Sequence, residues 1–156
     1  MLYLFKTLLV TTFMTCFTFI FPKEEWSLAC DNVVATVYNA VPDQCDETPS
    51  TTASMFRLDL NDVYSHRIIA MERTFMKELG LKYGDVVKIE GTKKWDGVWQ
   101  VQDTMNKKYV GQKKIDFLVP SDIKTGKWSN VKLYVLNDKT KTTYYKNNMA
   151  PQIKNK

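Results

Sequence analysis

Short apolar runs separated by turns fill the middle of this chain, and their spacing predicts β-strands. Hydrophobic side chains recur there at every second position or in short unbroken runs, the pattern of half-buried and buried strands. Strands are predicted at residues 33–38, 66–71, 86–90, 95–103, 115–119 and 131–136. A helix is predicted over residues 72–79, where apolar side chains share one face and Gly80 ends it. This mostly β pattern, with one or two short helices, favours a small closed barrel over a doubly wound sheet.

The two ends of the chain differ from this middle section. Lys6 precedes an apolar stretch over residues 7–21, which is typical of an export signal and short for a full membrane span of ~20 residues. Residues 1–26 are therefore predicted to be a signal peptide or a signal anchor, with cleavage and membrane retention as alternatives. The barrel domain is predicted over residues 27–137. Residues 138–156, rich in lysine, asparagine and threonine, are predicted to form a flexible basic tail.

Composition narrows the choice of partner. A length of 156 residues with 44% hydrophobic side chains indicates one globular domain. The net charge of +5 favours an acidic polymer, whether nucleic acid, anionic lipid or an anionic cell envelope. The sequence contains no zinc finger, aromatic–basic RNA-binding motif or basic helix, so no nucleic-acid partner is expected. Together with the export signal, the charge predicts a place in the periplasm or cell envelope.

The cysteines are interpreted in the light of export. Cys16 lies in the predicted signal, which leaves Cys30 and Cys45 as a pair in an oxidising compartment, on either side of the strand at 33–38. That strand holds its ends roughly 20 Å apart, so a disulfide requires the following loop to fold back, and two unpaired thiols are the alternative. His66 is the only histidine and no C-x-x-C motif occurs, so neither a metal nor a cofactor is expected.

Two aspartates at strand positions are the leading candidates for chemistry. Asp103 follows one apolar run, and Asp116 lies inside another, on the face opposite Ile115 and Phe117. A carboxylate between large apolar neighbours is costly to bury and is usually either paired or used in a reaction. The alternative for each is a solvated aspartate on the outer face of a strand.

Six motifs occur in order along the chain and together resemble a known domain. They are A-T-V-Y (35–38), T-T-A-S (51–54), I-A-M-E (69–72), L-K-Y-G-D-V-V-K-I (81–89), V-Q-D-T-M-N (101–106) and K-I-D-F (114–117). Their order resembles the 3D domain, which is named for three aspartates, over roughly residues 33–136. The resemblance implies a six-stranded double-psi β-barrel, similar to the catalytic barrel of membrane-bound lytic transglycosylase A.

The resemblance also implies roles for single residues. Asp116 matches the third aspartate, the catalytic acid of the transglycosylases, Asp103 matches the second, and Glu72 stands in place of the first. Candidate substrate-binding residues are Thr52, Tyr38, Asn106 and Trp99. Met55 and Met105 depart from the family pattern, because each stands where the family has a glycine whose backbone takes part in a tight approach.

The implied function is that of an exported lytic transglycosylase, which cleaves the glycan strand of peptidoglycan without water. Protonated Asp116 would donate to the glycosidic oxygen, and as a carboxylate it would then accept the proton of the muramoyl 6-hydroxyl, which closes a 1,6-anhydro ring. Because no water attacks, one principal acid suffices. The alternatives are a barrel that binds cell-wall polysaccharide without cutting it and a structural envelope protein, anchored in the membrane through residues 7–21.

A donor of this kind needs a pKa raised above its ordinary value of ~4. Burial between Ile115 and Phe117, with Asp103 and Glu72 close by, would raise the pKa of Asp116, and nearby lysines would lower it. The lysines concerned are Lys107, Lys108, Lys113 and Lys114, with solvated turn positions as the alternative. The aromatic residues Trp95, Trp99, Trp128 and Tyr109 are candidates either to stack on sugar rings or to fill the barrel.

Overall fold

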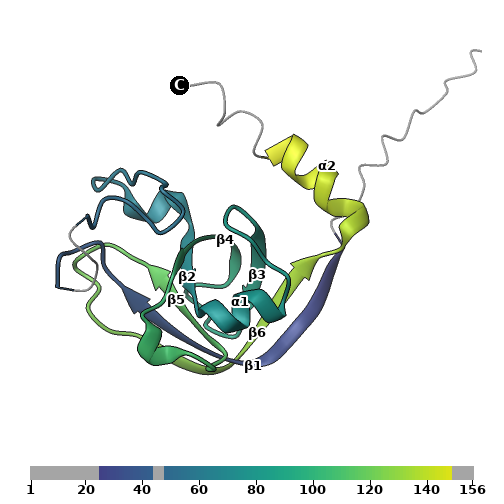
Figure 1. Cartoon of the computed structure of the whole chain (residues 1–156), viewed down its shortest axis with the longest axis horizontal. Coiled ribbons are helices and arrows are strands. Elements are labelled where there is room, and N and C mark those ends of the chain that lie inside the picture. Colours follow the sequence, from purple (N-terminus) through teal and green to yellow (C-terminus); the bar gives the residue numbers. More distant parts are fainter. Residues whose placement is uncertain (1–24, 44–47, 149–156) are drawn as a thin grey trace, which may run out of the picture.

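The computed structural model describes residues 25–43 and 48–148, and its strands close into a barrel (Figure 1). The strands are β1 (Trp26–Tyr38), β2 (Ile68–Met71), β3 (Val86–Glu90), β4 (Gly97–Thr104), β5 (Lys114–Leu118) and β6 (Lys127–Leu136). The helices are the 3-10 turn η1 (Val63–His66), α1 (Arg73–Glu78), the 3-10 turn η2 (Lys107–Tyr109) and α2 (Asp138–Asn148). Around the barrel the strand order is β1-β5-β2-β4-β3-β6. The predicted mostly β, six-stranded fold is confirmed.

The strand directions show an internal twofold symmetry. β1 and β5 are parallel, as are β2 and β4, and the remaining neighbours are antiparallel. Exchanging β1 with β4, β2 with β5 and β3 with β6 leaves every neighbour and every direction unchanged. The barrel is therefore built from two interlocked, topologically equivalent halves, each contributing one strand to each parallel pair. This is the topology of a double-psi β-barrel, and its pseudo-twofold axis passes between β2 and β5.

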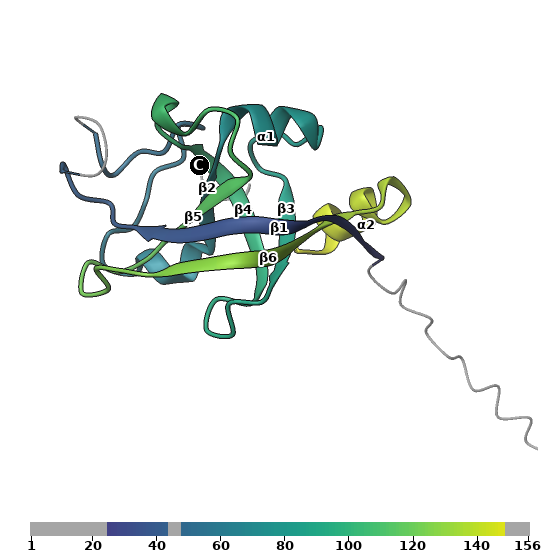
Figure 2. The ribbon, with the colours of Figure 1, turned by 90° about the horizontal axis from the view of Figure 1, so that it is seen from below.

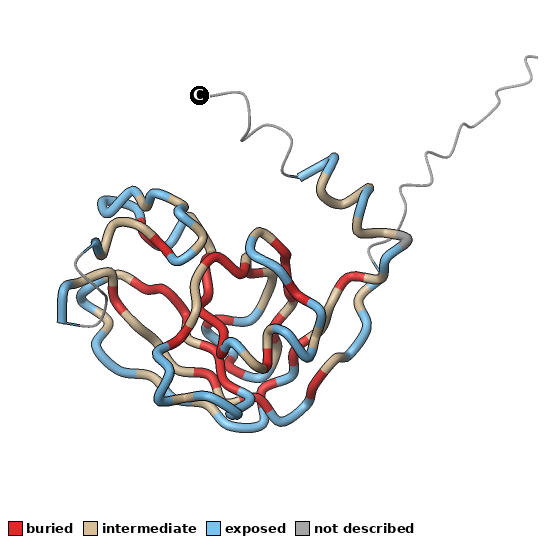
Figure 3. Tube along the Cα trace, in the orientation of Figure 1, coloured by how far each residue is buried: buried red, intermediate tan, exposed pale blue. Residues whose placement is uncertain are grey.

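Buried positions, red in Figure 3, concentrate in the strands of the barrel. The core that their side chains form includes several aromatic rings. Trp99 is 0% exposed, its ring centroid lies 4.7 Å from that of Phe117, and its indole N–H donates to the Trp95 carbonyl over 2.8 Å. Arg67 covers the other side, with its guanidinium carbon 3.9 Å from the Trp99 ring centroid. These buried surfaces dominate the stability of the core, since aromatic side chains each bury a large area. Trp95 and Trp99 therefore belong to the core.

Several strand ends differ from the prediction. β1 and β6 run side by side as a long bulged ladder, so both begin earlier than predicted (Figure 2). β2 begins later, at Ile68, because the preceding residues form η1. Asp62 caps η1 by accepting a hydrogen bond from the Ser65 N–H, and Arg67 ends it in the left-handed conformation with φ of 48°. His66 thus lies in a turn and not at the start of a strand.

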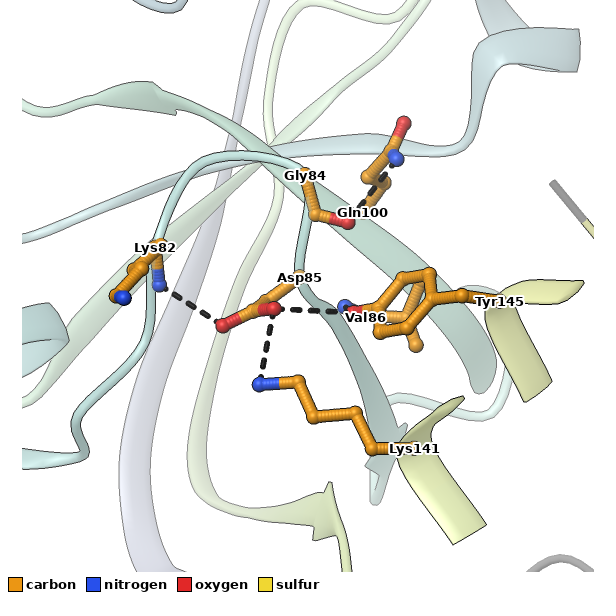
Figure 4. Close-up of polar contacts among 7 residues, drawn as sticks. All are labelled: Lys82, Gly84, Asp85, Val86, Gln100, Lys141 and Tyr145. Atoms are coloured by element: carbon orange, nitrogen blue, oxygen red, sulfur yellow. Dashed lines mark hydrogen bonds and ion pairs between the residues drawn. The ribbon is translucent and has the colours of Figure 1, made fainter. Parts of the chain in front are cut away.

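The C-terminal segment contains the helix α2, so the predicted flexible tail is wrong as far as residue 148. The Tyr145 hydroxyl accepts from the Val86 N–H at 2.9 Å and donates to Asp85 Oδ1 at 3.1 Å (Figure 4). Lys141 Nζ lies 3.0 Å from the same Asp85 oxygen. A polar helix of this length is marginal alone, so contacts with the barrel stabilise it. Residues 149–156 lie outside the described part of the chain.

The remaining predictions about the chain ends concern Cys30 and the N-terminal segment. Cys30 has a free thiol, buried in the barrel wall, which donates to Asn32 Oδ1 over 3.0 Å. The predicted disulfide is therefore not formed at Cys30, and Cys45 lies outside the described residues. The predicted signal segment lies outside them as well. Within residues 25–43 and 48–148, no helix is both long and apolar enough to cross a membrane.

Removing the Tyr145 hydroxyl should loosen the contact of α2 with the barrel. Tyr145→Phe leaves the Val86 N–H without its acceptor and Asp85 without one donor, which should lower the free energy of unfolding by about 1–2 kcal/mol. Urea denaturation measures this change. Tyr83→Phe is the matched control, because Tyr83 is 43% exposed and its hydroxyl makes only a 3.4 Å contact with Thr104. Equal stability of the two variants would contradict the docking of α2 through Tyr145.

Candidate functional site

Four residues in register form one rung across neighbouring strands of the barrel. The rung consists of Thr36 on β1, Asp116 on β5, Ala70 on β2 and Asp103 on β4. Side chains in register project to the same face of a sheet, and here that face is the outside of the barrel, since neighbouring β2 and β5 side chains fill the interior. Two strand spacings separate the Asp116 and Asp103 backbones, roughly 10 Å. The small side chain of Ala70 lies between them and leaves the space above it open.

A β-bulge places Asp103 on this outer face. Strict alternation from Val101 would turn Asp103 into the barrel interior. The register instead shifts by one residue, because Ile69 pairs with Val101 while Ala70 pairs with Asp103, which makes Gln102 the additional residue. Bulges often re-aim a side chain beside a functional site in this way. The two aspartates consequently line the same cleft.

The cleft over this rung has a volume of about 750 Å³. Its floor is the rung, and its walls come from the loop after β1, the loop at residues 49–53, the start of α1 and the turn η2. Charged and hydroxyl groups that line it outside the rung include Tyr38, Asp43, Thr52, Arg73, Lys108 and Lys114. Among the described residues, no group of three or more His, Cys, Asp or Glu side chains is placed to hold a metal ion.

Asp116 is the unusual group in the cleft. Its Oδ1 atom is buried and has no hydrogen-bond partner among the described residues. Burial raises the pKa of this carboxyl group to about 6, and the positive charges of Lys114 and Lys108 act in the opposite direction. The pKa of Asp116 thus rises because burial shields the carboxyl group from water, as predicted. Neither Asp103 nor Glu72 contributes to it.

Asp103 is fully engaged in holding the cleft together. Its Oδ1 accepts hydrogen bonds from the Ala53 N–H at 3.1 Å and the Thr104 N–H at 2.8 Å, and its Oδ2 accepts from the Tyr38 hydroxyl at 3.1 Å. These bonds tie the 51–54 loop and the end of β1 to β4. A carboxylate with three donors is suited to fixing the geometry of a site, and poorly placed to activate a water molecule as well.

Glu72 occupies a different place from the one predicted. It is 1% exposed, caps the N-terminus of α1, and is not among the residues that line the cleft. Its two oxygens accept from the Thr74 N–H at 2.9 Å and the Phe75 N–H at 2.8 Å. Burial raises the pKa of Glu72, but these hydrogen bonds outweigh it and hold the pKa below its usual range. The structure therefore places Glu72 as the cap of α1, outside the cleft, with both of its oxygens used in capping.

The candidate substrate-binding residues divide into two groups. Tyr38, Thr52 and Asn106 line the cleft, whereas Trp99 is enclosed in the barrel and its predicted role is wrong. The Thr52 hydroxyl accepts from the Phe56 N–H at 3.2 Å, and Asn106 caps η2 by accepting from the Lys108 N–H at 3.0 Å. Both side chains therefore shape the walls of the cleft through local turns.

The two methionines that the sequence resemblance places at glycine positions behave differently. Met55 is 78% exposed and adopts φ of 68°, the left-handed region that glycine enters without cost. The tight turn is therefore retained, with a side chain that projects into solvent. Met105 is buried and its N–H donates to the Met71 carbonyl over 3.1 Å. At Met105 the backbone is not in the left-handed region, and the side chain joins the packing instead.

Lys114, named from the sequence only among the lysines that would lower the pKa of Asp116, lies in the cleft itself. It is only 9% exposed, its Nζ lies 3.8 Å from Asp116 Oδ1, and the same atom lies 3.8 Å from the Tyr109 ring centroid. The alternative, a solvated turn lysine, does not hold for Lys114, since it is buried and is the first residue of β5. The sequence signal that places Lys114 beside Asp116 is their spacing, because residues two apart on a strand share a face.

Comparison with known proteins adds little to this picture. No family model matches the chain, and no curated protein matches it. A solved structure that it resembles is described as the crystal structure of the computationally designed msDPBB_sym2 protein, at 20% identity and a TM-score of 0.36. That match covers 68% of this chain and 99% of the designed one. The strand topology therefore defines the class, a double-psi β-barrel, with a cleft over one rung of its wall.

The raised pKa of Asp116 predicts a pH-dependent loss of stability. In the unfolded chain Asp116 ionises near its ordinary value of 3.8, and in the folded chain only near 6. The stability it contributes is therefore present below pH 4 and lost as the pH rises through 6. A difference of two pKa units corresponds to about 3 kcal/mol. Asp116→Asn should gain up to that amount relative to wild type between pH 4 and pH 7, measured by urea denaturation.

Asp122→Asn is the matched control for this measurement, because Asp122 is exposed and lies away from the cleft. Its pH dependence should follow that of wild type. If Asp116→Asn also follows wild type, the carboxyl group of Asp116 is not shielded from water in the folded protein.

Proposed function

We propose that this barrel is an exported lytic transglycosylase, which cleaves the glycan strand of peptidoglycan with Asp116 as acid and then as base. The observation that carries the proposal is the state of Asp116. One oxygen of Asp116 is buried and has no hydrogen-bond partner among the described residues, and burial raises the pKa of the carboxyl group to about 6. The residue lies at the floor of an open cleft. A carboxyl group that holds its proton near neutral pH and faces a cleft is suited to proton donation.

In the proposed reaction Asp116 carries the proton in both steps. It first donates its proton to the glycosidic oxygen, and the bond from the anomeric carbon to that oxygen breaks through an oxocarbenium-like state. The Asp116 carboxylate then takes the proton of the muramoyl 6-hydroxyl. The oxygen of that hydroxyl forms a bond to the anomeric carbon, which closes the 1,6-anhydro ring and restores protonated Asp116.

The non-hydrolytic route is favoured by the state of the other carboxylates. Asp103 accepts three hydrogen bonds, and both oxygens of Glu72 cap α1. Asp43 also lines the cleft, from the loop after β1. A hydrolytic enzyme needs a carboxylate free to activate water or to attack the sugar. An intramolecular hydroxyl nucleophile removes that need, and Asp103 then acts by holding the 51–54 loop against the cleft.

The cleft also has features that suit an acidic glycan. Its volume of about 750 Å³ lies within the range of ordinary small-ligand sites, and Arg73 and Lys108 add positive charge at its exposed edge. Tyr109 is the aromatic residue of the η2 wall that is placed to contact a sugar ring. We extend the proposal to location: residues 1–26 export the chain and residues 7–21 are its membrane anchor when uncleaved, so the substrate is met in the envelope.

A glycan-binding barrel without activity is the second candidate. The observation in its favour is the pair formed by Lys114 and Asp116, because the positive charge favours the ionised form of Asp116, which cannot donate a proton. The two candidates differ in whether fragments are released from the cell wall.

Replacing Asp116 separates the candidates. Asp116→Asn is nearly isosteric but neither donates nor accepts the proton, so release of fragments from purified sacculi should fall by ~10⁴-fold or more. Mass spectrometry of the wild-type products should find anhydromuramoyl ends. Asp122→Asn should release fragments at the wild-type rate. Ordinary reducing ends would instead identify water as the nucleophile, with Asp103 or Asp43 as its base. Binding of sacculi without release by wild type would contradict the enzyme and support the glycan-binding barrel.

A further inference from the structure

The distance between Lys114 and Asp116 suggests a specific ligand position. Lys114 Nζ and Asp116 Oδ1 are 3.8 Å apart, which is close enough for an ion pair and too far for a direct hydrogen bond. Oδ1 is at the same time buried and without a hydrogen-bond partner among the described residues. A buried oxygen in that state carries a free-energy cost that a ligand can remove. One oxygen atom about 2.8 Å from both groups would satisfy them together, once the side chains that enclose Oδ1 move to admit it.

Lys114 is held in the position that creates this gap. Its backbone is fixed in β5, in register with Val34 of β1, and its carbonyl accepts from the Glu72 N–H at 3.0 Å. The ammonium group lies 3.8 Å from the centroid of the Tyr109 ring, a cation–π contact that orients it across the cleft. Such a contact replaces part of the lost hydration of a buried ammonium. The gap is therefore a consequence of the fold and not of a freely moving side chain.

Other charged or titratable groups line the same cleft. They are Lys108 and Tyr109 from η2, Arg73 from α1, Asp103 from β4, Tyr38 from β1 and Asp43 from the loop after β1. Arg73 and Lys108 are exposed, and the Tyr38 hydroxyl donates a hydrogen bond to Asp103. In the described part of the cleft, the ion pair of Asp116 is made with Lys114.

We propose that the Lys114 ammonium and the Asp116 carboxyl group form one binding position for a sugar hydroxyl, in which Lys114 donates a hydrogen bond to the hydroxyl oxygen and Asp116 exchanges a proton with it. The inference rests on the proposed function for the identity of the sugar. Lys114 acts through this hydroxyl and through Asp116, so it is a positioning residue.

The position also accounts for the second step of the proposed reaction. When the Asp116 carboxylate takes the hydroxyl proton, the O–H bond of the sugar breaks and a bond from that proton to Oδ1 forms. The electron pair left on the sugar oxygen makes the new bond to the anomeric carbon. Lys114 keeps all its protons throughout, and its positive charge stabilises the negative charge that develops on the sugar oxygen.

Binding of a small probe tests the position without requiring activity. The probe is the disaccharide of N-acetylglucosamine and N-acetylmuramic acid, and NMR of the protein follows both its affinity and the carboxyl resonance of Asp116. Lys114→Met keeps the length of the side chain and removes the donor, so the Kd should rise at least ~10-fold. The pKa of Asp116 in the free protein should rise, since Lys114 lowers it in wild type. Lys114→Arg should restore much of the affinity.

Two further variants control for folding and for general charge. Lys107→Met removes an exposed lysine of η2 that is not among the residues lining the cleft, and it should change the Kd by less than ~3-fold. Tyr109→Leu removes the ring under Lys114 and leaves the ammonium, so an intermediate loss of affinity is expected. An unchanged Kd in Lys114→Met, or equal losses in Lys114→Met and Lys107→Met, would overturn the proposal. If wild type fails to bind the disaccharide, the proposal is also overturned.

The outcome is separable from that of the proposed function. A Kd that rises in Lys114→Met, measured in a protein that releases no fragments from sacculi, supports the hydroxyl position and rejects the enzyme. If wild type releases fragments and Lys114→Met binds the disaccharide with an unchanged Kd, the enzyme is supported and the hydroxyl position is rejected.

Discussion

The pairing of β2 with its two neighbours is the constraint on which the site depends. β2 is four residues long and entirely buried, and Ala70 at its centre is in register with Asp116 on one side and Asp103 on the other. The pseudo-twofold axis of the barrel passes beside this position, so the rung is symmetric in strand pairing apart from the bulge at Gln102, and asymmetric in chemistry. Asp116 corresponds to Ala70, and Asp103 corresponds to Thr36. A slip of one residue in β2 would turn Ala70 into the barrel and close the floor of the cleft.

Opposing electrostatic effects set the state of Asp116 on this scaffold. Loss of water raises its pKa, and Lys114 limits the rise, so that the group gains and loses a proton near neutral pH. The other carboxylate of the rung, Asp103, accepts three hydrogen bonds that hold the walls of the cleft in place. One oxygen of Asp116 thus lacks a hydrogen-bond partner among the described residues, while Asp103 accepts three hydrogen bonds. Such a difference assigns distinct roles to two similar groups.

Sequence pattern predicted those parts of the site that follow unbroken local rules. The alternation along β5 correctly placed Asp116 opposite Ile115 and Phe117, because no bulge interrupts that strand. The outward turn of Asp103 depends on a register shift against β2, and the helix α2 depends on contacts of its tyrosines with the barrel, so neither is visible in a local pattern. Glu72 was assigned by motif position, although a glutamate directly before a helix is also placed to cap it.

A crystal structure of the Asp116→Asn variant with a peptidoglycan tetrasaccharide tests the central claim most directly. The account predicts that the glycan lies over Ala70 in the cleft, with a glycosidic oxygen within about 3 Å of the residue 116 side chain. It also predicts contact with Lys114 and Tyr109 in the η2 wall of the same cleft. A glycan bound elsewhere, such as the smaller cavity lined by Leu60 and Tyr64, or bound with no oxygen near residue 116, would contradict it.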